Sequence, residues 1–304
     1  MIDVSNKSNS LRYARATGSL TAKSQTIKLV KNRQIPKGDV IEVARAAGIN
    51  GAKRTAEWVI FCHPIPLDWI GINFSIGEDT ITVTAEIKSV WKTGVEMEAL
   101  TAVQCALINI YDMLKPLDNS LRITDIHLEE KRGGKSDLHL EPPVSLRAAI
   151  VVISDSAYEG KREDKSGKEL GRLLSQNGIK TEKTIVIPDD RETIKGTLIS
   201  LSDTDKVDLI LTTGGTGIGP RDVTPEATLE VIDREIRGIE AQLHRYGHER
   251  TPFAMLSRAI AGVRKNTLII NLPGSSKGVK EGFEAIFPAV LHVFPMLRGE
   301  GHDK

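Results

Sequence analysis

The feature that most constrains the fold is a change of pattern in the middle of the chain. Before it, strand-like and helix-like segments follow no regular order; after it, short apolar runs alternate with helical segments. A polar, proline-containing stretch over residues 133–145 separates the two patterns. Irregular order is typical of an antiparallel sheet with helices, and regular alternation is typical of a mostly parallel sheet. At 304 residues the chain has room for about two domains, which we expect at 1–143 and 144–304.

The first part predicts an antiparallel sheet packed against helices. Residues 70–76 and 81–87 carry apolar side chains at every second position and flank a short polar turn, which predicts a hairpin. Residues 95–115 instead carry apolar side chains three and four positions apart, which predicts a helix that Pro116 ends. We therefore expect an α+β domain of ferredoxin-like type.

The second part predicts a three-layer α/β/α domain with a mostly parallel sheet. Continuous apolar runs of this kind are typical of buried parallel strands. We expect strands at 148–153, 181–187, 207–212 and 267–272. We expect helices from 167 to about 177 and at 191–201, 225–236 and 279–291.

Composition excludes several classes of protein. Lys and Arg number 41 against 40 Asp and Glu, and aromatic residues make up 4%, so a basic or base-stacking nucleic-acid surface is not expected. The two cysteines, Cys62 and Cys105, are too few for a disulfide framework or a four-thiolate zinc site. We see no apolar signal segment at the start and no run of the roughly 18 apolar residues that a membrane helix needs. These observations favour a cytoplasmic protein.

A loop rich in glycine and threonine follows one predicted strand of the second part. The loop Thr213–Gly217 can bring backbone N–H groups and hydroxyls close to one anion, although an ordinary turn is the alternative. Asp222 comes shortly afterwards, and a carboxylate beside a phosphate needs a bridging cation such as Mg²⁺. Asp189 follows another strand, where a solvated turn is the alternative. Thr224 is expected to cap the next helix.

A second loop of this kind follows the strand at 267–272. It contains Gly274, Ser275 and Ser276, followed by Lys277. Hydroxyl groups, backbone N–H groups and a lysine together can hold a second anionic group. Two such loops at one edge of a sheet indicate a ligand with separated phosphates, or two ligands.

The order and spacing of these motifs resemble the molybdopterin adenylyltransferase family over about 146–304. The motifs are Ser154-Asp155, Asp164-Lys165-Ser166-Gly167, Thr213–Gly217, Arg221-Asp222-Val223-Thr224-Pro225-Glu226-Ala227 and Leu272-Pro273-Gly274. The resemblance implies transfer of AMP from ATP to molybdopterin with Mg²⁺, and no tightly bound cofactor. It implies catalytic and Mg²⁺-binding roles for Asp189 and Asp222. It implies ligand contacts from Asp155, Thr213, Gly214, Gly215, Thr216, Gly217, Gly274, Ser275 and Ser276.

Several polar residues of the first part, taken one at a time, have ordinary structural explanations. A lone His63 is usually structural, and Asp112 and Lys115, three apart on a helix, usually form a surface ion pair. Cys62-His63 lacks a second pair with metal-ligand spacing, so it indicates zinc only weakly.

Together, however, the motifs of 1–137 resemble cyclic pyranopterin monophosphate synthase. They are Lys37-Gly38-Asp39-Val40, Ala52-Lys53-Arg54-Thr55, Cys62-His63-Pro64, Thr93–Thr101, Ile110-Tyr111-Asp112-Met113 and Gly133-Gly134-Lys135-Ser136. The resemblance implies conversion of 3′,8-cyclo-7,8-dihydro-GTP into the cyclic pyranopterin and pyrophosphate. It implies that the catalytic residues are Asp112, Lys115, Lys37 and His63. It implies substrate contacts from Phe61, Cys62, Met97 and Glu98, with Arg12 and Lys135 binding the triphosphate.

The two resemblances imply a bifunctional enzyme whose partners are the small-molecule substrates, including ATP. They also imply a homo-oligomer, a trimer of dimers, because the two families form trimers and hexamers. One alternative is that only one domain is catalytic and the other is a pterin-binding or assembly scaffold. Another is that the second domain binds molybdopterin without transferring AMP.

Overall fold

The computed structural model describes residues 1–134 and 146–299. The chain divides into two compact units, Met1–Leu138 and His139–Lys304, called the first and second unit. The boundary expected between residues 143 and 144 lies outside the described residues. Within the two described ranges, no helix is both long enough and apolar enough to cross a membrane.

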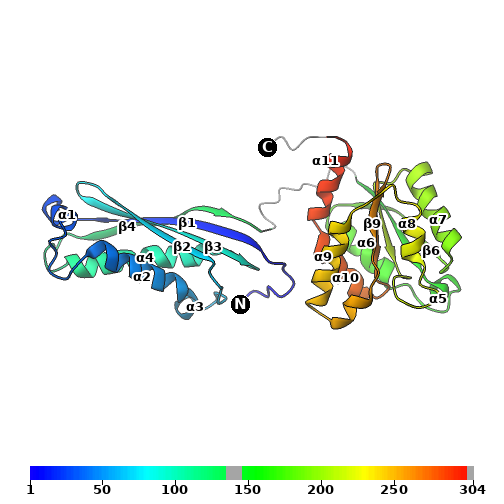
Figure 1. The fold of residues 1–304 in the computed structure, drawn as a ribbon, viewed down its shortest axis with the longest axis horizontal. Helices are drawn as coiled ribbons and strands as arrows, with labels where there is room; N and C mark the ends of the chain where they lie inside the picture. The colour runs from blue at the N-terminus through cyan, green and yellow to red at the C-terminus, as the bar shows by residue number, and fades with distance from the viewer. Residues whose placement is uncertain (135–145, 300–304) are drawn as a thin grey trace. The chain divides into compact units, whose positions relative to one another are not determined.

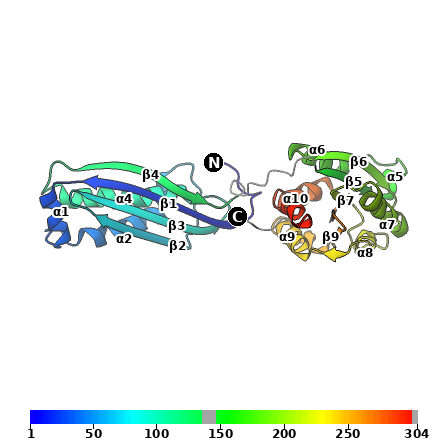
Figure 2. The same cartoon turned by 90° about the horizontal axis from the view of Figure 1, so that it is seen from above.

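The first unit has the ferredoxin-like arrangement that the sequence predicts. Its sheet has the order β2-β3-β1-β4 with every neighbouring pair antiparallel, and Figure 2 shows the four strands side by side. The strands are β1 (Ser10–Thr21), β2 (Trp69–Ile76), β3 (Thr80–Trp91) and β4 (Arg122–Arg132). The helices are α1 (Ser24–Lys31), α2 (Val40–Lys53) and α3 (Thr55–Trp58) after β1, and α4 (Glu96–Leu114) after β3. The expected hairpin is β2–β3, and the expected helix is α4.

Helix α4 is buried on two sides, against the sheet and against α2 (Figure 1). Small residues make both approaches possible. A Cβ added to Gly18 of β1 would lie 2.8 Å from Leu107 and Val103 of α4. A Cβ added to Gly51 of α2 would lie 2.6 Å from the sulfur of Cys105. Glycine is therefore required at both positions, and the close packing fixes α4 in place.

The second unit is the expected three-layer domain. Its sheet has the order β6-β5-β7-β10-β9-β8, in which β6, β5, β7 and β10 are parallel and β9 pairs antiparallel with both β10 and β8. The strands are β5 (Arg147–Ile153), β6 (Lys180–Ile187), β7 (Leu209–Thr213), β8 (Arg234–Glu235), β9 (Ala261–Arg264) and β10 (Thr267–Leu272). The α-helices are α5 (Asp155–Tyr158), α6 (Ser166–Gln176), α7 (Arg191–Ile199), α8 (Thr224–Leu229), α9 (Arg237–His248), α10 (Ser276–Ile286) and α11 (Val293–Leu297). One apolar core lies between the sheet and α6 and α10, and another lies between the sheet and α7 and α8.

Two predicted helices have different bounds in the structure. The helix expected at 225–236 is α8, which ends at Leu229, because the following segment pairs with β9 instead. The N–H groups of Asp233 and Ile236 donate to the carbonyls of Val263 and Ala261, at 2.8 and 2.7 Å. The helix expected at 279–291 is α10, which begins at Ser276 and ends at Ile286 before a proline.

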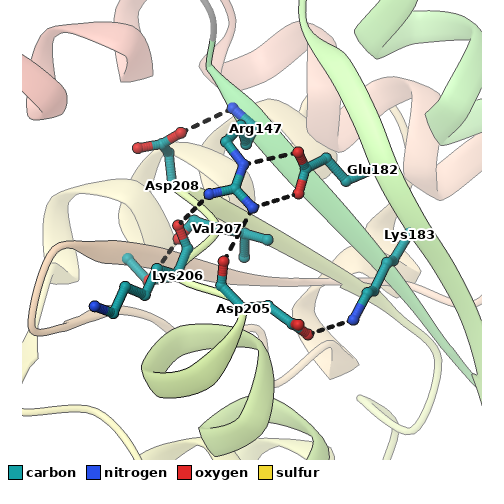
Figure 3. A network of polar contacts seen from close by, with 8 residues as sticks. Arg147, Glu182, Lys183, Asp205, Lys206, Val207 and Asp208 are labelled. Atoms are coloured by element: carbon teal, nitrogen blue, oxygen red, sulfur yellow. Dashed lines mark hydrogen bonds and ion pairs between the residues drawn. The ribbon is translucent and has the colours of Figure 1, made fainter.

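A polar network holds the start of β5 at the amino edge of the parallel strands (Figure 3). The guanidinium of Arg147 donates two hydrogen bonds of 2.7 Å to the carboxylate of Glu182, and a third of 3.0 Å to the carbonyl of Asp205. Its backbone N–H donates to the carboxylate of Asp208 at 2.8 Å. The network fixes the position of β5, whose other end leads into the site loops.

Candidate functional site

Two lysines flank one aspartate at the end of α4. The ammonium group of Lys37, which precedes α2, donates to both the backbone carbonyl and the carboxylate of Asp112, each at 2.8 Å. The ammonium group of Lys115 contacts the other carboxylate oxygen at 2.7 Å. Hydrogen bonds from Lys115 and Lys37 lower the pKa of Asp112 to about 2, and Asp112 in turn raises the pKa of Lys115. At neutral pH Asp112 is therefore ionised, and its carboxylate lies between the side chains of Lys37 and Lys115.

A second group of predicted residues lies at the other end of α4. Phe61, Cys62 and His63 follow α3, and with Met97 and Glu98 of the first turn of α4 they line a cavity of about 480 Å³. The guanidinium of Arg12 donates to the carbonyls of Trp91, the last residue of β3, and Lys92, which follows it and precedes this turn. Arg12 therefore belongs to this group. Lys135 lies outside the described residues.

The length of α4 separates the two groups. Glu98 and Asp112 are fourteen positions apart, which is about 21 Å at the helical rise of 1.5 Å per residue. The structure of one chain brings Lys37, Asp112 and Lys115 together, but it does not bring His63 to them. A proton relay among all four residues within one chain is therefore excluded by their placement.

Glu98 is a buried carboxyl group between two cavities. It is 3% exposed and lines both the cavity beside His63 and a second cavity of about 280 Å³ beside Arg54 and Thr55. Burial, followed by the neighbouring charge of Glu96, raises the pKa of Glu98 to about 7. A carboxyl group with this pKa can donate or accept a proton near neutral pH.

The buried carboxyl predicts a pH dependence of stability. Because the folded pKa of Glu98 is about 7 and its ordinary value is 4.5, the folded state retains a proton that the unfolded state loses as pH rises. Raising the pH from 5 to 8 should therefore lower the free energy of unfolding of the first unit by about 2 to 3 kcal/mol through this group. Glu98→Gln should remove that loss, so the variant gains stability relative to the original at pH 8.

Urea unfolding at pH 5 and pH 8 measures this difference. Glu96→Gln is the matched control, because Glu96 is two residues earlier on α4 and pairs with Lys131 at 3.7 Å. The control should keep most of the pH dependence of the unsubstituted protein, because burial contributes more than the charge of Glu96 to the raised pKa of Glu98. Equal pH dependence in Glu98→Gln and the unsubstituted protein would contradict the assigned protonation of Glu98.

In the second unit the predicted loops meet at the carboxyl edge of the parallel strands. The hydroxyl of Thr213 donates to the carbonyl of Pro273 at 2.8 Å, and a Cβ added to Gly274 would lie 3.2 Å from the Cα of Gly214. Thr224 does not cap α8 as expected. It is the first residue of that helix, and its buried hydroxyl donates to the carbonyl of Gly214 at 3.0 Å, which ties the glycine loop to the helix.

Three carboxylates lie beside the glycine loop. The backbone N–H groups of Asp155 and Asp189 each donate to the other's carboxylate, at 2.9 and 3.0 Å, and Arg221 pairs with Asp155 at 2.6 Å. The carboxylate of Asp222 accepts the N–H of Gly219 at 2.8 Å. Burial, and then the charges of Asp155 and Asp222, raise the pKa of Asp189. Negative charge therefore accumulates where the glycine loop offers N–H groups.

A cavity of about 340 Å³ opens between the two loops, called the loop cavity. Its lining includes seven of the predicted residues, namely Asp189, Asp222, Thr213, Gly215, Gly274, Ser275 and Ser276. Four other predicted residues adjoin lining residues in the sequence or contact them, but do not line the cavity themselves: Asp155, Gly214, Thr216 and Gly217. Lys277 lines a neighbouring cavity instead.

Arg258 is a residue of this site that the sequence patterns did not reveal. Its guanidinium donates to the carbonyl of Gly217 at 2.7 Å and also bonds the carbonyl of Asp222 and the carboxylate of Glu226. Its backbone N–H donates to the carbonyl of Thr216 at 2.9 Å. Arg258 thus joins the glycine loop to the residue that follows it. It lies in an irregular segment, where neither periodicity nor capping signals mark it.

Two carboxylates of the loop cavity have the chemistry to hold an Mg²⁺ ion together with a phosphate. Within residues 1–134 and 146–299, no group of three or more His, Cys, Asp or Glu side chains is placed to hold a metal ion. Mg²⁺, however, is commonly held by one or two carboxylates together with substrate phosphates and water. Asp189 and Asp222, which both line the loop cavity, meet that smaller requirement.

Two family models match the chain, one for each unit. Residues 1–134 match the MoaC family, and residues 149–292 match a probable molybdopterin binding domain. A crystal structure of a molybdopterin biosynthesis enzyme from Thermus thermophilus matches at 41% identity and a TM-score of 0.49. The match covers 51% of this chain and 97% of that one.

Some relatives align with nearly the whole of this chain, and others align with only about half of it. A molybdenum cofactor biosynthesis bifunctional protein of Chlorobaculum tepidum is 41% identical over 99% of this chain and 96% of its own length. One from Synechococcus elongatus is 35% identical over 99% and 98%. A cyclic pyranopterin monophosphate synthase of Clostridium perfringens is 51% identical over 45% of this chain and 87% of its own length. This chain belongs to the family of bifunctional molybdenum cofactor biosynthesis proteins.

Proposed function

We propose that the chain carries two enzymes of molybdenum cofactor biosynthesis. The first unit converts 3′,8-cyclo-7,8-dihydro-GTP into cyclic pyranopterin monophosphate and pyrophosphate. The second unit transfers AMP from ATP to the terminal phosphate of molybdopterin and releases pyrophosphate. The observation that carries the first assignment is the ionised Asp112 held between Lys37 and Lys115.

The lysine cluster suits the phosphate chemistry of the first reaction. A ribose-derived hydroxyl attacks the inner phosphate of the substrate, and the bond to the departing pyrophosphate breaks. Because Asp112 raises the pKa of Lys115, that side chain is protonated and can stabilise the leaving group or donate a proton to it. Lys37 adds a second positive charge, and Asp112 holds both ammonium groups in place.

We further propose that two copies of the chain complete each synthase site. Glu98, which lines the cavity beside His63, and Asp112, which contacts Lys115, are about 21 Å apart along α4, too far for their groups to act on the same reacting atoms. Beside His63, the side chains of Ile60 and Phe61 are 85% and 75% exposed, which is an apolar surface that a second copy would cover. A symmetric dimer in which each copy supplies one group satisfies both observations, and it is compatible with the expected trimer of dimers.

Mixing two inactive variants tests this arrangement. Lys115→Ala and His63→Ala should each abolish pterin formation alone. When equal amounts of the two variants reassociate at random, about half of the dimers are mixed. Each mixed dimer contains one site with both groups intact and one site with neither, so about a quarter of the original activity should return. The assay follows pterin product after joint refolding or co-expression. A mixture of Lys115→Ala with Lys37→Ala is the control, because both changes lie in the same half and no activity should return.

Absence of recovery from the Lys115→Ala and His63→Ala mixture would contradict the shared site. Recovery in the control mixture would contradict the assignment of Lys37 and Lys115 to one half.

The loop cavity supports the second activity. Its glycine-rich loop and the segment Gly274–Ser276 offer N–H groups and hydroxyls to phosphates, and Asp189 and Asp222 would hold Mg²⁺. Bound Mg²⁺ supplies charge neutralisation for the phosphates of ATP. The loops align the two phosphate groups, and Arg258 keeps the glycine loop in place.

Pyrophosphate release from ATP tests the second activity. Release that depends on molybdopterin supports adenylyl transfer. Binding of molybdopterin without release would instead support the binding module that the sequence left open.

A further inference from the structure

Asp118 is a buried carboxylate three residues beyond Lys115. It is 2% exposed, although it lies in the loop that follows α4. Its backbone N–H donates to the carbonyl of Leu114 at 3.1 Å, and the N–H of Leu117 donates to the same carbonyl at 2.9 Å. These bonds fix Asp118 to the last turn of α4. Its position relative to Asp112 and Lys115 is therefore set by that helix.

The carboxylate of Asp118 joins this loop to the start of α1. One oxygen accepts the backbone N–H of Lys23 at 2.7 Å and the hydroxyl of Thr26 at 3.0 Å, at the beginning of that helix. The other oxygen accepts the N–H and the hydroxyl of Ser120, at 2.8 and 2.6 Å. Burial acts to raise the pKa of Asp118, but these hydrogen bonds outweigh it and hold the pKa below its usual value. Asp118 is therefore ionised, and hydrogen bonds to a charged group are stronger than neutral ones.

Helix α1 leads directly to Lys37 through a short turn with hydrogen bonds of its own. The N–H of Gln34 donates to the carbonyl of Leu29 at 2.9 Å, and the N–H of Gly38 donates to that of Ile35 at 3.0 Å. Ile35 is 5% exposed and packs in the apolar core of the first unit. These contacts connect the backbone at Lys37 to α1, so a shift at the start of α1 is passed on to Lys37.

The contact between Lys37 and Asp112 depends on how these two segments are held together. Asp112 and Lys115 lie three positions apart at the end of one helix, so their ion pair forms without a second segment. Lys37 is 75 positions from Asp112 in the chain, and its side chain is 42% exposed. A long, exposed side chain has many rotamers. Its ammonium group therefore stays at Asp112 only while the backbone at Lys37 is held at the right distance.

We propose that Asp118 is a positioning residue for the synthase reaction, which joins the segment that supplies Lys37 to the helix end that supplies Asp112 and Lys115. The inference rests on the proposed function of the first unit. Asp118 acts through α1 and Lys37. Weakening its bonds to α1 should therefore release Lys37 and leave the ion pair between Asp112 and Lys115 intact.

Two variants that each remove one hydroxyl from the Asp118 carboxylate test this inference. Thr26→Val removes a bond to α1, and Ser120→Ala removes a bond within the loop that carries Asp118 itself. The intact protein is treated briefly with a small amount of acetic anhydride at neutral pH. Acylation of Lys37 and of Lys115 is then measured separately by mass spectrometry of peptides.

A lysine that is held by hydrogen bonds must lose them before its amine reacts. Thr26→Val should therefore raise the ratio of Lys37 to Lys115 acylation about 5-fold, the scale of one lost hydrogen bond. Ser120→Ala is the matched control and should leave this ratio unchanged.

Pterin formation from 3′,8-cyclo-7,8-dihydro-GTP should follow the same order. The rate should fall about 5-fold in Thr26→Val and stay near the original in Ser120→Ala. Asp118→Asn should have a larger effect on both measurements, because its amide has only one acceptor oxygen and turns an NH₂ group toward buried donors.

An unchanged acylation ratio in Thr26→Val would overturn the inference. Equal ratios in Thr26→Val and Ser120→Ala would do the same. So would equal increases at Lys37 and Lys115, which a general loosening of the first unit would produce. If the ratio rises as expected but pterin formation does not fall, the role of Lys37 in the proposed reaction is contradicted instead, so the two failures are distinguishable.

Discussion

Replacing Lys115 with alanine should lower the rate of pterin formation by at least about 1000-fold, which is the scale of a lost proton-transfer or charge-stabilising group. Lys115 lies at the end of α4 with its ammonium group 2.7 Å from Asp112, and its side chain is 56% exposed. Its removal therefore leaves the packing of α4 unchanged. The measurement is pterin product per unit time from 3′,8-cyclo-7,8-dihydro-GTP.

Two companion variants separate this role from a general loss of charge. Lys28→Ala removes an exposed lysine from α1 and should leave the rate unchanged. Asp112→Asn removes the group that raises the pKa of Lys115, so the basic limb of the pH–rate profile should move to lower pH. A basic limb that stays in place would contradict the assignment of that limb to Lys115.

Replacing Asp222 with asparagine should lower molybdopterin-dependent pyrophosphate release by about 100-fold or more and raise the Mg²⁺ concentration that the reaction needs. Asp222 lines the loop cavity with Asp189, and one carboxylate fewer leaves the phosphates and their cation less well held. The assay is pyrophosphate release across a series of Mg²⁺ concentrations. Pterin formation in the first unit should be unaffected, which provides an internal control for folding.

Asp190→Asn is the matched variant for this test. Asp190 is adjacent to Asp189 but caps α7, accepting the N–H of Thr193 at 2.9 Å, and asparagine caps a helix equally well. Its transfer activity should stay close to that of the unsubstituted protein. Equal losses in Asp190→Asn and Asp222→Asn would contradict a specific role for Asp222.

Strands with large apolar side chains on their buried face can be predicted from the sequence, because those side chains produce a clear apolar pattern. Hairpin β2–β3 and the parallel strands β5, β6, β7 and β10 follow this rule. Strand β1 escaped prediction because Ala14, Ala16 and Gly18 form much of its buried face. At Gly18 a side chain would collide with Val103 and Leu107 of α4. A search for apolar periodicity does not detect a position where close packing requires the absence of a side chain.

The candidate sites show a similar limit. The motifs implied, through the resemblance, that Lys37, His63, Asp112 and Lys115 act in one site, and the structure brings Lys37, Asp112 and Lys115 into contact. They could not show that α4 separates His63 from this cluster, since spacing along the chain does not give spatial distance. Residues that act by bracing a loop, such as Arg258, have no local pattern and become visible only in the fold.

The central claim is that this protein carries two independent enzymatic activities, one in each unit. The most direct measurement supplies the intact protein with 3′,8-cyclo-7,8-dihydro-GTP in one assay and with ATP and molybdopterin in the other, and repeats both with Lys115→Ala and Asp222→Asn. We expect both products from the unsubstituted protein. Each variant should lose one product and keep the other. A folded protein that forms only one product, or a single substitution that abolishes both, would contradict the account.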